Sequence, residues 1–298
     1  MKKYNFNSKL EEIAVEKFGK RPLYEYEKIK VIEVPNFPSL GKIVALRFIE
    51  WLQLNPDGVI SLPTGKTPEY FIKWTRFYLE NWDKKEVKRE LDVWGIDYKN
   101  KPDMRNYWFV QIDEFYPMDP ERENSFNYYI RKFYIEGFGL NPQKTILMNT
   151  FTVGVPKGLN LFHVFPDGKV DLTLRYRMPK NEIEKRQQEA IYAIDRYCME
   201  YDKKIEELGG IGFFLGGIGP DGHIAFNIRG SDHNSTTRVL KINYETSAAA
   251  AVDLGGIENS RDKAVMTIGL ATITKNPTTT AIIMAAGVSK ASVVRDAI

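Results

Sequence analysis

The sequence is poor in cysteine and has no long apolar segment. Cys198 is the only cysteine among 298 residues, so no disulfide can form within the chain, which fits a reducing cytoplasm. Cys198 lies on the apolar face of a predicted helix, where a core thiol is expected rather than a nucleophile. Lys2 and Lys3 precede no apolar stretch, so no signal peptide is expected. No run of about 18 apolar residues is present, so no membrane span is expected either.

An excess of charge of one sign is also absent. The chain has 42 basic and 39 acidic residues, which gives a net charge of +3. This balance does not favour nucleic acid or an acidic membrane surface as a partner. The hydrophobic fraction of 43% is ample for a core, and the length suits one large α/β domain or two small ones.

The apolar pattern alternates between short buried strands and amphipathic helices. Helices are predicted at 39–54, 69–79 and 181–208, and strands at 29–34, 59–62, 107–112, 211–215, 264–268 and 281–286. A helix that leads directly into a strand indicates a right-handed βαβ crossover. The pattern therefore predicts a doubly wound, mostly parallel, Rossmann-like α/β sheet with helices on both faces. Residues 1–34 are interpreted as an N-terminal extension and first strand, and residues 35–298 as the α/β domain.

Histidine is scarce as well, with three in the chain, and one of them lies in a glycine-rich loop. His223 and Asp221 follow the predicted strand at 211–215, among glycines at 216, 217, 219 and 222. The loop also matches the dinucleotide pattern G-x-G-x-x-G, but Pro220 removes a backbone donor and Asp221 would face the pyrophosphate. A structural loop with a hydrogen-bonded histidine is the second interpretation. A sugar-phosphate site, with Asp221 and His223 in acid–base roles, is the third.

Two further segments place polar groups directly after strands. Residues 63–68 read Pro-Thr-Gly-Lys-Thr-Pro, and Thr67 is predicted to cap a helix whose exposed amides attract phosphate. A nucleotide P-loop is disfavoured because Ile60 stands where its first glycine is required. Asp113 and Glu114 follow the strand at 107–112. Ordinary structural roles, a capped junction and a surface ion pair, remain alternatives. Because strand ends share one edge of a parallel sheet, these segments are expected to meet in one crevice.

The string Gly-Pro-Asp-Gly-His-Ile-Ala-Phe-Asn at 219–227 resembles the signature of glucosamine-6-phosphate deaminases. Its Gly-x-Asp-Gly-His core is also similar to that of 6-phosphogluconolactonases, which share the superfamily. The segments Leu-Pro-Thr-Gly-x-Thr-Pro and Ile-Asp-Glu-Phe resemble the family's phosphate loop and base segment. The resemblance covers about residues 35–298, and family members usually continue beyond the point where this sequence stops.

The resemblance implies a role for each candidate residue. Asp113 would be the base that moves a proton between C2 and C1, His223 would assist ring opening at O5, and Asp221 would orient His223 or relay protons. The phosphate would be bound by Thr64, Gly65, Lys66, Thr67 and Lys290. The resemblance implies neither a cofactor nor a metal, and the sequence leaves a homo-oligomer open.

Two positions depart from the family pattern. Ile228 stands where deaminases carry a Glu of the His–carboxylate relay, and Val252 stands where an Arg binds phosphate. Asp232 or Glu245 are candidates to supply the missing carboxylate. A sugar-phosphate isomerase and deaminase is the leading hypothesis. The alternatives are a 6-phosphogluconolactonase-like hydrolase, in which His223 activates water and Asp113 is not essential, and a sugar-phosphate-sensing module.

Overall fold

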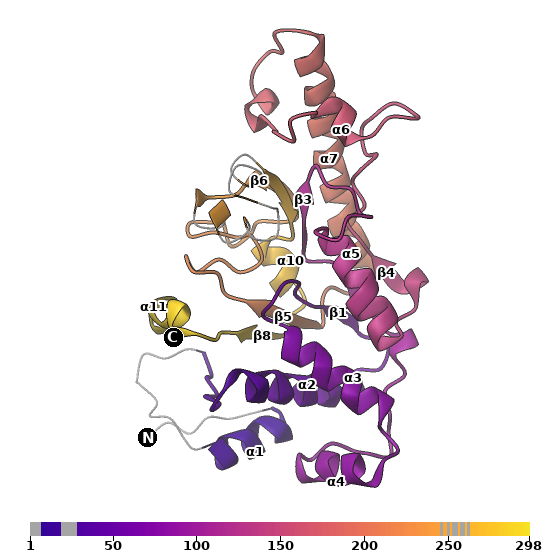
Figure 1. Ribbon diagram of the computed structural model, residues 1–298, viewed down its shortest axis with the longest axis vertical. Helices are drawn as coiled ribbons and strands as arrows, with labels where there is room; N and C mark the ends of the chain where they lie inside the picture. Colours follow the sequence, from indigo (N-terminus) through magenta and orange to yellow (C-terminus); the bar gives the residue numbers. More distant parts are fainter. Residues whose placement is uncertain are drawn as a thin grey trace.

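A computed structural model of the protein describes residues 7–18, 29–244, 247, 248, 251, 256, 260 and 263–298. Its centre is a five-stranded parallel sheet with the order β4-β2-β1-β5-β8 (Figure 1). The strands are β1 (Val59–Ser61), β2 (Trp108–Val110), β4 (Thr145–Ile146), β5 (Phe213–Gly217) and β8 (Thr280–Met284). The predicted mostly parallel α/β fold is confirmed.

A second, antiparallel sheet lies beside the first and was not predicted. It has the order β3-β7-β6, from β3 (Asp113–Tyr116), β7 (Ala264–Thr267) and β6 (Arg238–Lys241). The strand expected at 264–268 therefore forms, but in this sheet rather than in the parallel one. Asp113 pairs with Thr267, so it is the first residue of a new strand, and two residues separate it from the end of β2.

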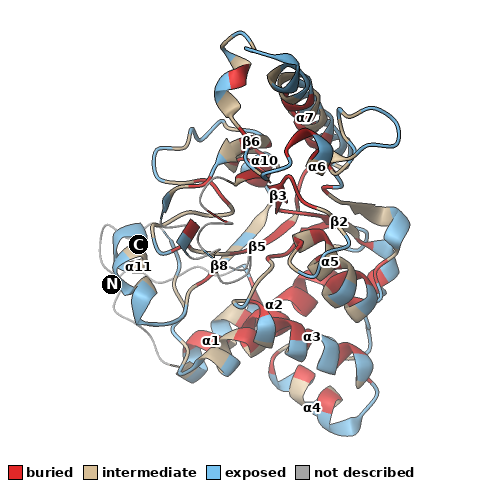
Figure 2. Cartoon of the chain, turned by 45° about the horizontal axis from the view of Figure 1, so that its top comes forward, coloured by how far each residue is buried: buried red, intermediate tan, exposed pale blue. Residues whose placement is uncertain are grey.

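Helices cover both faces of the parallel sheet. On one face, α2 (Phe37–Leu54) and α3 (Glu69–Glu80) pack aromatic side chains against β5. The ring of Phe48 lies 5.1 Å from that of Phe213 and 5.5 Å from that of Phe71, between centroids. Burying each such ring contributes roughly 1.5–3 kcal/mol. Figure 2 shows the buried residues gathered in α2 and β5, whereas α11 (Ala291–Ala297) is largely exposed.

The other face is covered by α7 (Glu182–Glu207), the longest helix of the described residues. Its apolar stripe, with Ile191, Ile194 and Cys198, packs into a core with Val110 and Phe214. Burial raises the pKa of the Cys198 thiol to about 12, so this thiol stays protonated near neutral pH, as expected for a core residue.

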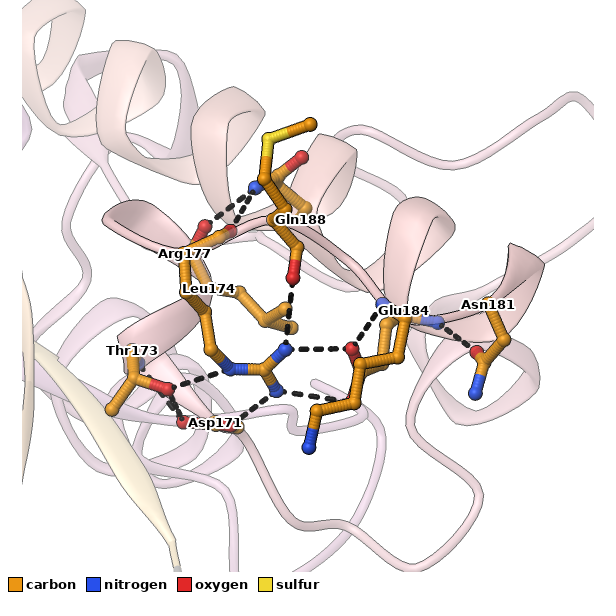
Figure 3. Close-up of polar contacts among 9 residues, drawn as sticks. Asp171, Thr173, Leu174, Arg177, Asn181, Glu184 and Gln188 are labelled. Carbon is orange, nitrogen blue, oxygen red and sulfur yellow. Dashed lines mark hydrogen bonds and ion pairs between the residues drawn. The ribbon is translucent and has the colours of Figure 1, made fainter.

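Two short helices lie between β4 and α7. They are α6 (Leu161–Val164) and the 3₁₀ helix η4 (Leu172–Arg175). The guanidinium of Arg177 donates to Glu184 at 2.7 Å and to Asp171 at 2.8 Å, which ties η4 to the first turn of α7 (Figure 3). Side-chain contacts of this kind, rather than strand pairing, order the segment.

The N-terminal extension contains one described helix and lacks the predicted strand. The helix α1 (Lys9–Phe18) is joined to α2 by Ser8, whose hydroxyl donates to Glu50, and by an ion pair between Arg47 and Glu11 at 2.7 Å. Residues 29–34, expected to be the first strand, are irregular. Ile32 and Val34 pack onto the cluster of helical side chains around α1 and α2. Their apolar character therefore reflects contact with helices rather than a sheet.

The remaining described elements are shorter and mostly connect the sheet to its helices. They are α4 (Lys85–Val93), η1 (Met104–Asn106), α5 (Phe126–Ile130), the π-helical turn η2 (Arg131–Glu136), η3 (Pro142–Lys144), α10 (Leu270–Thr274) and η5 (Val288–Lys290). No helix among the described ranges is long and apolar enough to cross a membrane.

Candidate active site

The predicted site residues follow four strands that are consecutive in the parallel sheet. The strands are β2, β1, β5 and β8, and they are followed by Asp113, by residues 64–67, by Asp221 and His223, and by Lys290, respectively. Because the carboxyl ends of parallel strands share one edge, these segments border the same side of the sheet. The fold therefore places the candidate acid–base groups and the candidate phosphate groups along one edge.

Asp221 and His223 form a close pair in the loop after β5. The Nδ1 atom of His223 lies 2.5 Å from Oδ1 of Asp221, and the side chains are only 16% and 15% exposed. The imidazole lies directly over Gly219, where an added Cβ would come within 2.1 Å of the ring. On its other flank the ring stacks with Phe226 at a centroid distance of 5.9 Å and an angle of 4°. Only glycine at 219 leaves room for this histidine.

The hydrogen bond sets the chemistry of the imidazole. A neutral ring that donates Nδ1–H to Asp221 has its lone pair on Nε2, which is then available to exchange a proton with a ligand. Burial alone would raise the pKa of Asp221, but hydrogen bonds from Asn243 and His223, together with the attraction of His223, hold this pKa below its ordinary value. Asp221 is therefore an ionised acceptor that orients His223.

The loop of His223 is fastened to the antiparallel sheet. The backbone N–H of Phe226 donates to Thr267 Oγ1 at 3.1 Å, and Asn227 Nδ2 donates to the carbonyl of Ile268 at 2.9 Å. Thr267 is the strand partner of Asp113. One residue of β7 thus links the histidine loop to the strand that carries the candidate base.

Asp113 and Glu114 are two adjacent buried carboxyl groups. Burial, together with repulsion from Glu114, raises the pKa of Asp113 to about 8, and burial raises the pKa of Glu114 to about 7. Glu114 accepts hydrogen bonds from the Ser125 hydroxyl at 2.7 Å and from the N–H of Asn127 at 2.8 Å, so its oxygens are engaged by the start of α5. Asp113 is the carboxyl group of the pair that remains suited to proton transfer.

The loop after β1 differs from the prediction in its capping. Thr67 was expected to cap α3, but the helix begins at Glu69 with Pro68 at the cap position and no side-chain hydrogen bond. Thr67 instead faces the end of β5, since a Cβ placed on Gly217 would lie 3.8 Å from its Oγ1. Thr64 is half-buried and Lys66 is exposed. The hydroxyl of Thr67 thus faces the neighbouring strand end instead of the backbone of α3.

Gly65 and two tyrosines shape the same loop. Gly65 has a φ of 84°, a conformation that favours glycine, and an added Cβ would meet nothing within 4 Å. Tyr129 donates its hydroxyl proton to the carbonyl of Gly65 at 3.0 Å, and Tyr134 does so to that of Pro63. The sequence did not single out these tyrosines, because nothing in their local pattern indicates a partner more than sixty residues away.

Comparisons with known proteins agree with this geometry, although no family model matches the chain. The glucosamine-6-phosphate deaminase of Bacillus velezensis is 28% identical over 267 residues, covering 90% of this chain and 86% of that protein. The one from Halothermothrix orenii is 25% identical and covers 91% and 87%. A solved structure of a monomeric glucosamine-6-phosphate deaminase, 22% identical, superposes with a TM-score of 0.62 over 90% of this chain and 86% of its own. The chain is a homologue of the glucosamine-6-phosphate deaminases.

The fold of this deaminase homologue is also found in 6-phosphogluconolactonases. A 6-phosphogluconolactonase from Trypanosoma cruzi, 16% identical, has a TM-score of 0.55 and covers 90% of this chain and 84% of its own. At this identity the likeness concerns the fold alone.

Of the two positions that depart from the deaminase pattern, the structure describes one, Ile228. Ile228 is half-buried directly after the histidine loop, and its carbonyl accepts from the N–H of Ser231 at 3.0 Å. Val252 and Glu245 lie outside the described residues. Asp232, the other candidate for a second carboxylate, accepts from the N–H of Asn234 at 2.8 Å within its own loop. The carboxylate of Asp221 lies within hydrogen-bond distance of His223, at 2.5 Å. Among the described residues, no group of three or more His, Cys, Asp or Glu is arranged to hold a metal ion.

Lys290 is the candidate cation of the phosphate end in this deaminase homologue. Partial burial lowers its pKa, and the negative charge of Asp221 acts in the opposite direction, so the two side chains influence each other across the strand ends. Lys290→Ala is expected to weaken binding of a sugar phosphate by about ten-fold or more, because a charged hydrogen bond contributes roughly 1.5–3 kcal/mol. Calorimetric titration with glucosamine 6-phosphate measures the change. Unchanged affinity in a folded variant removes Lys290 from the site.

Proposed function

We propose that the protein converts glucosamine 6-phosphate to fructose 6-phosphate and ammonia. The single observation that carries this proposal is the position of a buried carboxyl group, Asp113, after β2 and of an oriented Asp–His pair after β5, two strands of one sheet that are separated by β1 alone. The homology to glucosamine-6-phosphate deaminases over most of the chain supports the same substrate. The proposed place of action is the cytoplasm, where the lone cysteine stays reduced.

The reaction needs two proton-transfer tasks, ring opening and isomerisation, and the site has a candidate group for each. His223, whose Nδ1 faces Asp221, transfers a proton to or from O5 and so opens the pyranose ring. Asp113 then removes the proton from C2 of the open-chain aldehyde and returns it to C1. This transfer turns the amine at C2 into an imine, and water converts the imine to the ketone with release of ammonia. A base with a pKa near the working pH is well suited to the second task, and Asp113 has a pKa of about 8.

Binding of the phosphate supplies orientation rather than chemistry. Thr64, Gly65, Lys66, Thr67 and Lys290 are the proposed contacts. They lie after β1 and β8, on either side of β5 in the sheet. A substrate anchored there by its phosphate would extend its C1–C2 end toward the acid–base groups, and fixed anchoring lowers the entropic part of the barrier.

A second function, hydrolysis of 6-phosphogluconolactone, is favoured by the Asp221–His223 pair, which can also activate a water molecule. The two functions are separated by assaying both substrates with the wild type and with Asp113→Asn. The proposed deaminase releases fructose 6-phosphate from glucosamine 6-phosphate, and loses this activity in the variant. Lactone hydrolysis that persists in the variant, with no turnover of the amino sugar, supports the hydrolase. Binding without turnover of either substrate supports a sensing module.

Ile228→Glu tests whether a second carboxylate limits the reaction. An aliphatic side chain can neither accept a hydrogen bond nor stabilise an imidazolium, so wild-type ring opening is expected to be slow. The variant is expected to turn over glucosamine 6-phosphate faster, by roughly ten-fold, below the full contribution of general acid–base catalysis. Ile228→Gln, which matches the shape without the charge, is the control. Fast wild-type turnover with no gain in the Glu variant contradicts this account.

A further inference from the structure

Asp221 has hydrogen-bond partners on both of its carboxylate oxygens. Oδ1 lies 2.5 Å from Nδ1 of His223, and Oδ2 accepts from Nδ2 of Asn243 at 2.6 Å. Asn243 comes two residues after β6, so it belongs to a different part of the chain from the histidine loop. Because Asn243 belongs to no motif, this contact was not expected from the sequence.

We propose that Asn243 is a positioning residue that fixes the plane of the Asp221 carboxylate and, through it, the orientation and tautomer of His223. The role in turnover rests on the function proposed above, whereas the effect on the imidazole does not. An amide that faces a carboxylate must present its N–H₂ group, because its oxygen would meet the lone pairs of Asp221. With Oδ2 held in this way, Asp221 cannot rotate away from His223 Nδ1.

The amide suits this place because it is neutral and cannot take a proton. A carboxylate at 243 would repel Asp221, and one of the two groups would then hold a proton. A donor without charge keeps Asp221 ionised, in agreement with the lowered pKa of this group. Asp221 therefore remains an acceptor for Nδ1–H throughout proton exchange at Nε2.

The antiparallel sheet explains why an asparagine after β6 reaches this loop. β7 is the middle strand, and its Thr267 holds the N–H of Phe226. β3, on one side, begins with Asp113, and β6, on the other side, leads to Asn243. The small sheet thus carries the candidate base, the anchor of the histidine loop and the partner of Asp221. We infer that it is the scaffold that sets the acid–base groups relative to one another.

The test reads the imidazole directly. Wild type, Asn243→Ala, Asn243→Asp and Asn243→Gln are labelled with ¹⁵N, and the ring signals of His223 are assigned from their loss in His223→Gln. The wild type is expected to show a slowly exchanging Nδ1–H and, in the neutral ring, a single tautomer with Nε2 unprotonated. Asn243→Ala is expected to lose the slow exchange and to populate both tautomers. Asn243→Asp should do the same more strongly, and Asn243→Gln, which keeps the amide, should restore part of the wild-type signal.

Kinetics on glucosamine 6-phosphate add a second readout. The kcat of Asn243→Ala is expected to fall by roughly ten-fold with little change in KM. An imidazole that loses its orienting partner transfers protons more slowly, whereas the contacts that bind the substrate are unchanged. Asn160→Ala is the control, since Asn160 caps α6 by accepting from the N–H of Phe162 at 3.0 Å. That variant should lose thermal stability while the His223 signals and kcat stay as in the wild type.

The outcomes separate this inference from the proposed function. His223 signals in Asn243→Ala that match the wild type overturn the positioning role, whatever the activity. If the wild type does not turn over the amino sugar but the ring signals change as expected, the proposed function fails and the positioning role stands. If Asn243→Ala does not fold, the His223 ring signals are compared between wild type and Asn243→Asp, which differs by one terminal group, and signals that match the wild type overturn the positioning role in the same way.

Discussion

Asp113→Asn is expected to lower turnover of glucosamine 6-phosphate by at least about 10²-fold, the usual contribution of a general base. Asparagine keeps the size of the side chain but cannot accept the proton from C2. In the wild type, transfer between C2 and C1 lets solvent deuterium enter the substrate, and NMR follows this exchange. Exchange at the wild-type rate in the variant shows that Asp113 is not the base.

The same substitution is expected to raise stability at alkaline pH. A higher melting temperature would show that the loss of activity in Asp113→Asn is not caused by misfolding. The pKa of Asp113 is raised from 3.8 to about 8 in the folded protein. Between these pH values the unfolded chain is ionised at this residue and the folded chain is protonated, so the contribution of Asp113 to stability falls as pH rises toward 8. Asparagine does not ionise, so the variant lacks this loss of stability with rising pH. The melting temperature of Asp113→Asn should therefore exceed that of the wild type most clearly at pH 8 and above.

His223→Gln is expected to produce the second large effect, a loss of about 10²-fold or more on glucosamine 6-phosphate. Glutamine retains a polar side chain but cannot exchange a proton with O5. The loss should disappear with the 4,5-dideoxy analogue of the substrate, which has no hydroxyl at C4 or C5 and therefore forms neither a furanose nor a pyranose ring. Deuterium exchange into that analogue should therefore be within a few-fold of the wild type in His223→Gln.

The open-chain analogue separates the two residues. Asp113→Asn should fail on both compounds, because proton transfer between C2 and C1 is needed in each. A His223→Gln variant that fails equally on the ring and open-chain compounds shows that His223 does more than open the ring. It would then have to take part in proton transfer at carbon or in imine hydrolysis.

Local patterns were sufficient for four of the five strands of the parallel sheet, β1, β2, β5 and β8, and for its long helices α2, α3 and α7, but not for the two-residue strand β4. The apolar stripe of α7 from Ile191 to Ile205 is contained in the local sequence, and the helix forms between Asn181 and Leu208, its N-cap and C-cap residues. The placement of candidate residues after β1, β2, β5 and β8 follows from strand order alone. These features depend on residues close together in the chain, so a single sequence can indicate them.

The features that the sequence did not indicate depend on distant partners. Asp113 appeared to end a strand, but its pairing with Thr267 makes it the start of another. Thr67 has the chemistry of a cap, yet Pro68 occupies that position. Asn243 belongs to no motif, and its role comes from reaching Asp221 across twenty-two positions of sequence. Contacts of this kind are set by the packing of the two sheets.

The most direct test of the proposed function is to incubate the wild-type protein with glucosamine 6-phosphate and to measure ammonia and fructose 6-phosphate in the same samples. The account predicts equal molar release of the two products, and the loss of both in Asp113→Asn. A protein that binds the sugar phosphate but releases neither product, or that releases ammonia without fructose 6-phosphate, would contradict it.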